Sequence, residues 1–232
     1  TVALYGAKVD ADLFRSLVRH VSPKTSIRYG TTEVGLVAQA DEAVVAAHPE
    51  AIGRPAAGVE IQIFDSAGQA VPRGMTGEIG IRTQAAVDRY LFDTELSARH
   101  FRGGWFFPGD AGYLSEDGVV VFKGRGDEMM SLNGINIFPA EIEAVALAYP
   151  GVEDCAAHPI VSGNHGNIPA LAVVAGSEVD LIALSRYCRD KLGLRAPPAA
   201  LRATPQWPQV RAWCLAAAMP CSMPAISVAW EP

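Results

Sequence analysis

Positive charge is scarce in this sequence. Its 19 Lys and Arg residues are outnumbered by 25 Asp and Glu residues, which gives a formal net charge of −6. Proteins that bind nucleic acid neutralise its phosphates with a basic surface, so this balance argues against nucleic acid as the main partner. Hydrophobic residues make up 50% of the 232 positions, which is enough for one large or two modest globular domains.

Metal-ligating side chains are few and scattered. The four cysteines form no C-x-x-C pair, and the five histidines form no H-x-x-x-H pair. We therefore expect a cytoplasmic protein with reduced thiols and no structural zinc site. The cysteines are Cys155, Cys188, Cys214 and Cys221.

An uninterrupted apolar run long enough for a membrane span is also missing. Residues 212–230 carry no charge, but Pro220 and Pro224 would break helical hydrogen bonding within them. We therefore expect no stable membrane span. The first residues lack the pattern of a signal peptide, and we take the initial Thr1 as a hint that the chain was cut from something longer.

The pattern of the first 45 residues is typical of the end of a large α/β subdomain. Residues 1–5 and 26–29 are apolar enough for buried strands. Between them an amphipathic helix is expected, with Asp10 or Asp12 as its cap.

The remaining residues divide into two further regions, so we expect a multidomain chain that combines α/β and α+β parts. Residues 46–126 hold short alternating segments between turn residues, which we interpret as a β-rich subdomain, a small distorted barrel. Residues 127–232 mix helical and strand patterns and are expected to form a small C-terminal α+β lid domain. The expected strands are residues 59–63, 78–82, 119–123, 152–159 and 170–175, and the expected helices are residues 139–149 and 179–192.

A run of glycine, hydroxyl and carboxylate residues follows the second expected strand and reads YGTTE at positions 29–33. A glycine beside hydroxyl residues lets backbone amides and hydroxyls approach a phosphate closely. A carboxylate directly after them can hold Mg²⁺ through its oxygens. A strand-to-turn junction with a threonine cap would explain the same residues without a ligand.

Two later runs place a carboxylate and a guanidinium beside glycines. The first, GGWFFPGD, ends at Asp110, and an ionised carboxylate can accept hydrogen bonds from a ribose diol. The second, GRGDE, contains Arg125, whose directed donors suit a phosphate or a ribose. Without a ligand, Asp110 would be a turn residue flanked by core aromatics. Residues 125–127 also spell the Arg-Gly-Asp adhesion tripeptide, a match short enough to arise by chance.

Taken in order, these runs resemble the AMP-forming (adenylate-forming) ligase superfamily: acyl- and aryl-CoA synthetases, luciferases and peptide-synthetase adenylation domains. Further matching segments are LYGA at 4–7, GEIGIR at 77–82, NGINIFPAEIE at 133–143 and PGVED at 150–154. The resemblance covers about residues 1–200 and is to the C-terminal half of an acyl-CoA synthetase.

The resemblance implies a nucleoside site. Gly6 and Ala7 would lie against the adenine, and Tyr29 would stack on its face. Asp110 would hold the ribose hydroxyls together with Arg125.

For the phosphate end, the resemblance implies that Gly30, Thr31 and Thr32 bind ATP and that Glu33 binds magnesium. Asp127 would be the hinge about which the C-terminal domain rotates, and Gly134 would border the CoA tunnel.

The activity implied is ATP-dependent activation of a fatty or aromatic carboxylic acid as acyl-AMP, followed by its transfer to CoA. The cofactors would be ATP, Mg²⁺ and CoA. Loading of a carrier protein instead of CoA stays open, as does a non-catalytic nucleotide-binding remnant.

Three departures from the family pattern suggest that this chain cannot complete the reaction alone. The Ser/Thr- and Gly-rich phosphate loop and most of the acid pocket would lie upstream of Thr1. The family's adenylation lysine has no counterpart, since Lys191 is the last lysine, so we assign no catalytic residue. We hypothesise that a frameshift replaced the native end after about residue 205. Ser131 stands where many members have a lysine, and this site varies.

Overall fold

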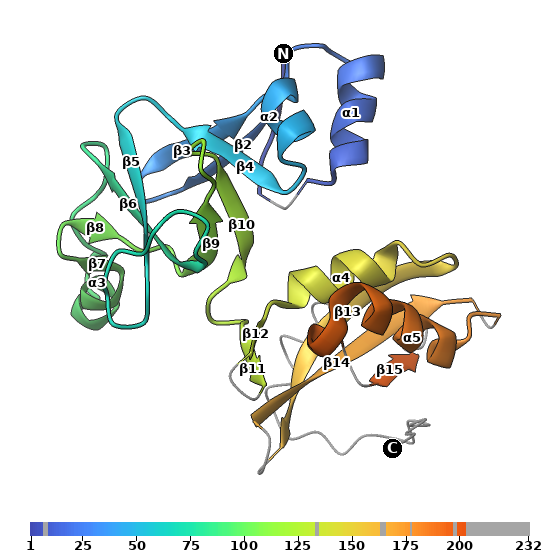
Figure 1. Ribbon diagram of the computed structural model, residues 1–232. Coiled ribbons are helices and arrows are strands. Elements are labelled where there is room, and N and C mark those ends of the chain that lie inside the picture. The colour runs from blue at the N-terminus through green and yellow to red at the C-terminus, as the bar shows by residue number, and fades with distance from the viewer. Residues whose placement is uncertain (7–8, 133–134, 163–165, 177, 197–198, 203–232) are drawn as a thin grey trace. The chain divides into compact units, whose positions relative to one another are not determined.

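The computed structural model describes residues 1–6, 9–132, 135–162, 166–176, 178–196 and 199–202. The chain divides into two compact units, Thr1–Gly126 and Asp127–Pro232 (Figure 1). The hypothesised replacement of the native end falls after residue 202 and so lies outside the described residues.

The first unit is built on one ten-stranded sheet. Strand β1 pairs in parallel with β2, and the other ladders are antiparallel. The order is β1 (Val2–Leu4), β2 (Thr25–Thr31), β3 (Gly35–Ala40), β4 (Ala51–Pro55), β10 (Val120–Arg125), β9 (Asp110–Leu114), β6 (Gly77–Thr83), β8 (Trp105–Phe106) and β7 (Phe101–Arg102), with β5 (Val59–Phe64) beside β6.

Helices α1 (Ala11–His20) and α2 (Glu42–Ala47) lie beside the β1–β4 end of this sheet (Figure 1). Helix α1 begins at Asp10, because the Asp10 carboxylate accepts hydrogen bonds from the amides of Asp12 and Leu13. Its Phe14 is fully buried against Ile27 of β2. Of the two caps expected from the sequence, the structure therefore uses Asp10.

The main core of the first unit lies on strands β2–β6, β8 and β10. Ile79 and Ile81 of β6 are fully buried, as is Val120 of β10. Tyr29 of β2 packs against the same cluster. This core thus holds β2, which carries Tyr29, and β10, which carries Arg125, in one packed layer.

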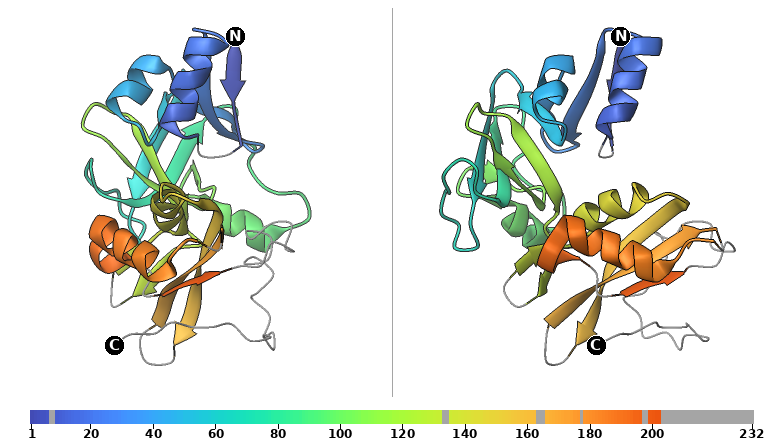
Figure 2. Two further views of the ribbon diagram at one scale, coloured as in Figure 1. Left: turned by 90° about the vertical axis from the view of Figure 1, so that its right-hand side faces the viewer. Right: turned by 45° about the vertical axis from the view of Figure 1, so that its right-hand side comes forward.

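The second unit is a five-stranded sheet with two helices. Strands β13 and β14 form a long hairpin, from the pair Val152 and Ala175 to the pair Ser162 and Gly166. Helices α4 and α5 cover one face of the sheet (Figure 2). Its elements are β11 (Met130–Leu132), β12 (Ile135–Ile137), α4 (Pro139–Leu147), β13 (Val152–Ser162), β14 (Gly166–Ala175), α5 (Leu181–Leu192), the 3₁₀ helix Gly193–Arg195, and β15 (Ala199–Arg202).

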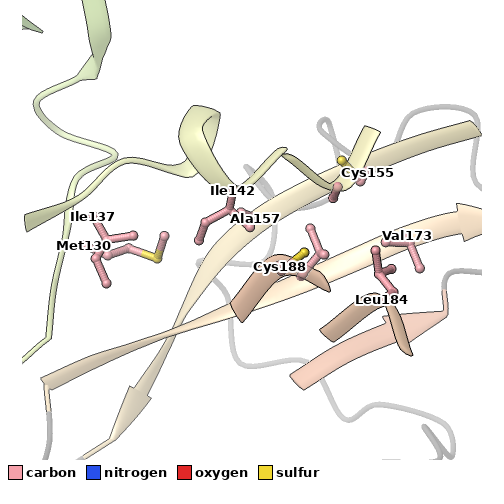
Figure 3. Close-up of a cluster of buried hydrophobic side chains, with 10 residues drawn as sticks. Met130, Ile137, Ile142, Cys155, Ala157, Val173, Leu184 and Cys188 are labelled. Carbon is pink, nitrogen blue, oxygen red and sulfur yellow. The ribbon is translucent and has the colours of Figure 1, made fainter. Parts of the chain in front are cut away.

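The core of the second unit joins the two helices to the hairpin. Ile142 of α4 and Leu184 of α5 are fully buried, and they belong to one cluster with Val173 of β14 (Figure 3). Cys155 and Cys188 are free thiols in this same cluster. Burial raises the pKa of the Cys188 thiol, so it stays protonated at neutral pH.

The elements expected from the sequence are all present, with shifted ends. The strand expected over residues 170–175 begins earlier, at Gly166, and the one expected over 152–159 runs on to Ser162. Strands β3 and β4 come before and after residue 46 in the chain and pair with each other, so one sheet continues past the border expected there. The separate barrel and the domain borders therefore stay predictions. No helix in the described part of the chain is long and apolar enough to cross a membrane.

Truncating Ile142 to alanine should lower the free energy of unfolding by about 2–5 kcal/mol, because it leaves a cavity in a packed core. The control is Leu147→Ala on the same helix, whose side chain is 44% exposed, and its cost should stay within about 1 kcal/mol. Urea denaturation followed by circular dichroism measures both. Equal losses would contradict the assigned orientation of α4.

Candidate functional site

A buried carboxylate joins three strands of the first unit. The Tyr29 hydroxyl donates a hydrogen bond to Oδ2 of Asp110 at 2.5 Å, and Nη1 of Arg125 donates to Oδ1 at 3.0 Å. Asp110 is 6% exposed, whereas 42% of the Arg125 side chain is accessible. The structure thus brings together three of the residues that the sequence predicts for a nucleoside site.

The register of β9 and β10 brings the two residues of this ion pair, Asp110 and Arg125, next to each other. Arg125 at the end of β10 lies directly opposite Asp110 at the start of β9, and facing residues of paired strands have adjacent side chains. Gly109 has a φ of +84°, and a Cβ there would lie 3.1 Å from Nη2 of Arg125. Arg125 also donates to the Pro108 carbonyl at 2.8 Å. The glycine therefore leaves room for the guanidinium to reach both acceptors.

The electrostatics of this trio favour a neutral Tyr29. Burial and the adjacent Asp110 carboxylate raise the pKa of Tyr29 well above its ordinary value, although Arg125 opposes the shift. Tyr29 therefore remains a donor across the physiological range. A carboxylate has about four acceptor positions, so two remain on Asp110 after Tyr29 and Arg125 are counted.

The end of β2 and the turn that follows it carry the rest of the YGTTE run. A Cβ on Gly30 would lie 2.3 Å from the Gly35 carbonyl oxygen, so the hairpin itself requires glycine there. From the sequence we expect Gly30 to let a phosphate approach the backbone closely. Backbone packing across the hairpin is a second and independent reason for this residue.

The two threonines of the turn differ in burial. Thr32 is exposed. The Oγ1 atom of Thr31 is buried. It lies close enough to Glu33 to lower the pKa of that carboxyl, yet no described atom lies at good hydrogen-bonding geometry to Oγ1. An unsatisfied buried hydroxyl is uncommon and calls for an explanation, such as a ligand atom.

Glu33 is half-buried and has a partner that the sequence did not predict. The Tyr90 hydroxyl donates to Oε1 of Glu33 at 2.8 Å. Partial burial alone would raise the pKa of Glu33. Hydrogen bonds to the carboxylate, chiefly the one from Tyr90, outweigh this effect and hold the pKa below its ordinary value. Partial burial and the bond to Glu33 raise the pKa of Tyr90 to about 12. Glu33 is therefore ionised at neutral pH.

The other expected site residues are less fully placed. Gly6 follows β1 with a φ of +85°, and since β1 runs parallel to β2 it lies toward the same end of the sheet as Tyr29. Asp127 is exposed in the turn after β10. Ala7 and Gly134 lie outside the described residues. Within the described residues, no group of three or more His, Cys, Asp or Glu could hold a metal ion.

Comparison with known proteins gives a consistent set of matches. Residues 1–91 match the family model described as AMP-binding enzyme. A 2-succinylbenzoate–CoA ligase of Geobacillus kaustophilus is 34% identical over 149 residues, which is 63% of this chain and 30% of that protein. The chain spans about a third of the length of the curated relatives that it matches first.

Two solved structures are similar in fold over most of this chain. The amide bond synthetase McbA from Marinactinospora thermotolerans aligns with a TM-score of 0.79 at 28% identity, over 87% of this chain and 42% of its own. ATP-bound MatB from Rhodopseudomonas palustris aligns with a TM-score of 0.75 at 26% identity, over 85% and 40%.

The raised pKa of Tyr29 has a consequence for stability. Tyr29→Phe should cost about 1–3 kcal/mol at pH 7, because Asp110 loses a donor. Tyr29 favours its protonated form in the folded state, so its contribution is complete below about pH 10 and is lost as the pH rises beyond it. Urea denaturation between pH 7 and 11 measures the free energy of unfolding of both proteins. The difference in this free energy between wild type and variant should therefore become smaller above pH 10. A constant difference would contradict the assignment.

Proposed function

Because residues 1–91 belong to the AMP-binding enzyme family, we propose that this chain is the nucleotide-binding C-terminal half of an ATP-dependent acid–thiol ligase. The complete enzyme would activate a fatty or aromatic carboxylic acid as acyl-AMP and transfer the acyl group to CoA. CoA ligases among the curated relatives support this reaction class.

The observation that carries the proposal is the Tyr29–Asp110–Arg125 trio. We assign the two remaining acceptor positions of Asp110 to the ribose hydroxyls, because a buried ionised carboxylate is a strong acceptor already oriented by its protein donors. The accessible guanidinium of Arg125 would add directed donors at the same ribose. Tyr29 would present its ring to the adenine, with Gly6 and Ala7 beside the base.

The turn that follows Tyr29 suits the phosphate end of the nucleotide. We assign Thr31 and Thr32 to the phosphates, with Gly30 allowing the backbone to come close. The buried Thr31 hydroxyl supports this, since no atom of the described residues meets it at good hydrogen-bonding geometry. Glu33 is ionised and would hold Mg²⁺. When bound, Mg²⁺ neutralises phosphate charge and polarises the phosphoryl oxygens.

The second unit fits the role of a lid. We assign residues 127–232 to the C-terminal domain, Asp127 to the hinge and Gly134 to the CoA tunnel. The division of the chain between Gly126 and Asp127 supports a hinge at this position. Rotation there would exchange the face used for acyl-AMP formation for the one used for thiol attack. Residues 1–45 and 46–126 would be the end of the α/β subdomain and the distorted barrel of the larger domain.

Two alternatives concern the acceptor of the acyl group and whether the chain is catalytic. A carrier protein could replace CoA as the acceptor, since both present a thiol to acyl-AMP. A non-catalytic nucleotide-binding remnant is favoured by one observation, the absence of any lysine after Lys191. We expect the protein in the cytoplasm, where thiols such as Cys155 and Cys188 stay reduced.

Isothermal titration calorimetry with AMP tests the nucleoside site. Asp110→Asn should weaken AMP binding by roughly tenfold or more, because the amide replaces an acceptor by a donor at one position. The matched control is Glu60→Gln, which removes an exposed carboxylate paired with Arg82 and should leave AMP binding unchanged. Absence of AMP binding in the wild type, or equal effects of the two variants, would overturn the proposal.

The isolated chain should show negligible ATP–pyrophosphate exchange with a panel of carboxylic acids. A missing catalytic cation costs several kcal/mol of transition-state stabilisation, which corresponds to orders of magnitude in rate. Radiolabelled pyrophosphate incorporation is the measurement, with an acid-free blank as the reference. Exchange clearly above the blank would show that the lysine is dispensable or replaced.

A further inference from the structure

We propose that Tyr90 is a positioning residue that holds the Glu33 carboxylate in the orientation required to bind the magnesium–nucleotide complex. The inference rests on the proposed function, because it assumes that Glu33 faces the phosphates. It deepens that function by assigning a role to a residue in a different segment, 57 positions further along the chain.

Two contacts attach the Tyr90 segment to the turn that carries Glu33. The phenol of Tyr90 donates to Oε1 of Glu33 at 2.8 Å, and the backbone amide of Val87 donates to the Glu33 carbonyl at 3.0 Å. The first contact restrains the side chain of Glu33, and the second restrains its backbone. Both ends of the glutamate are therefore held by residues 87–90.

Tyr90 is itself anchored by the helix that follows it. Its amide donates to Oγ of Ser97 at 2.9 Å. Ser97 lies in α3 (Thr94–His100), and its hydroxyl donates to the Asp93 carbonyl at 2.6 Å. The Tyr90 ring also meets the rings of His100 and Phe101 edge-on, at centroid distances of 5.8 and 5.4 Å. The phenol is thus held in place by ring contacts and by the backbone of its own segment.

This anchoring has a direct consequence for a bound cation. A glutamate side chain has several rotatable bonds, and fixing them costs free energy when a ligand binds. The Tyr90 bond to Oε1 restrains them in the free protein while using only one of the acceptor positions of the carboxylate. A neutral donor also leaves the negative charge of Glu33 in place. The carboxylate is therefore preorganised for a metal ion.

Calorimetric titration of the 232-residue protein with ATP, once with MgCl₂ and once with EDTA, separates positioning from mere packing. Tyr90→Phe keeps the ring and its contacts but removes the hydroxyl. It should weaken binding of magnesium–ATP by about tenfold, the effect of one hydrogen bond to a charged group. Binding of ATP in EDTA should be unchanged, because Glu33 has no cation to hold there. Tyr113→Phe, the same change at a half-buried tyrosine of β9, is the control and should alter neither titration.

A double-mutant cycle completes the test. Glu33→Gln should abolish the gain in ATP affinity that magnesium provides, and adding Tyr90→Phe to it should then have no further effect. Additive effects, equal weakening with and without magnesium, or a wild-type response of Tyr90→Phe would overturn the role of Tyr90 while the proposed function stands. A wild-type chain that binds no ATP, or binds it equally well with and without magnesium, would overturn both.

Discussion

The burial of one carboxylate governs the arrangement of the first unit. A carboxylate can lie in the protein interior, as Asp110 does, only where charge and hydrogen bonds compensate for the lost water. Arg125 and Tyr29 provide both, and they come from segments 15 and 81 positions away in the chain. The order of strands in the sheet must therefore bring β2 near β9 and β10, and the packed core around Ile79 and Val120 holds them there.

The two ends of the candidate site follow the same physical plan. At each end a tyrosine hydroxyl donates to a carboxylate, Tyr29 to Asp110 and Tyr90 to Glu33, and each tyrosine has a raised pKa. In each case the donor lies far from its acceptor in the sequence and comes from a different element. At each end an uncharged tyrosine hydroxyl therefore orients a carboxylate in the free protein, and at Asp110 the charged Arg125 adds a second donor.

Local patterns predicted the local parts of this structure well. The Asp10 cap, the helix after Pro139 and the alternation in β5 depend on neighbouring residues, which a sequence displays directly. Tyr90 could not have been found in this way, since nothing near it in the sequence marks it as the partner of Glu33. Strands β7 and β8, each with two residues, are too short to show any periodicity. The contact between Tyr29 and Asp110 was likewise hidden, and the family resemblance alone placed them at one nucleoside.

The constraint on Gly30 changes how genetic data on this turn should be interpreted. Any side chain at that position would collide with the backbone of Gly35, so selection against substitutions there acts on the hairpin whether or not a nucleotide ever binds. An intolerant Gly30 in a mutational screen is thus no measure of phosphate recognition. Thr32, which is exposed on the same turn, is free of this ambiguity, and tolerance at that position tests the proposed phosphate contact.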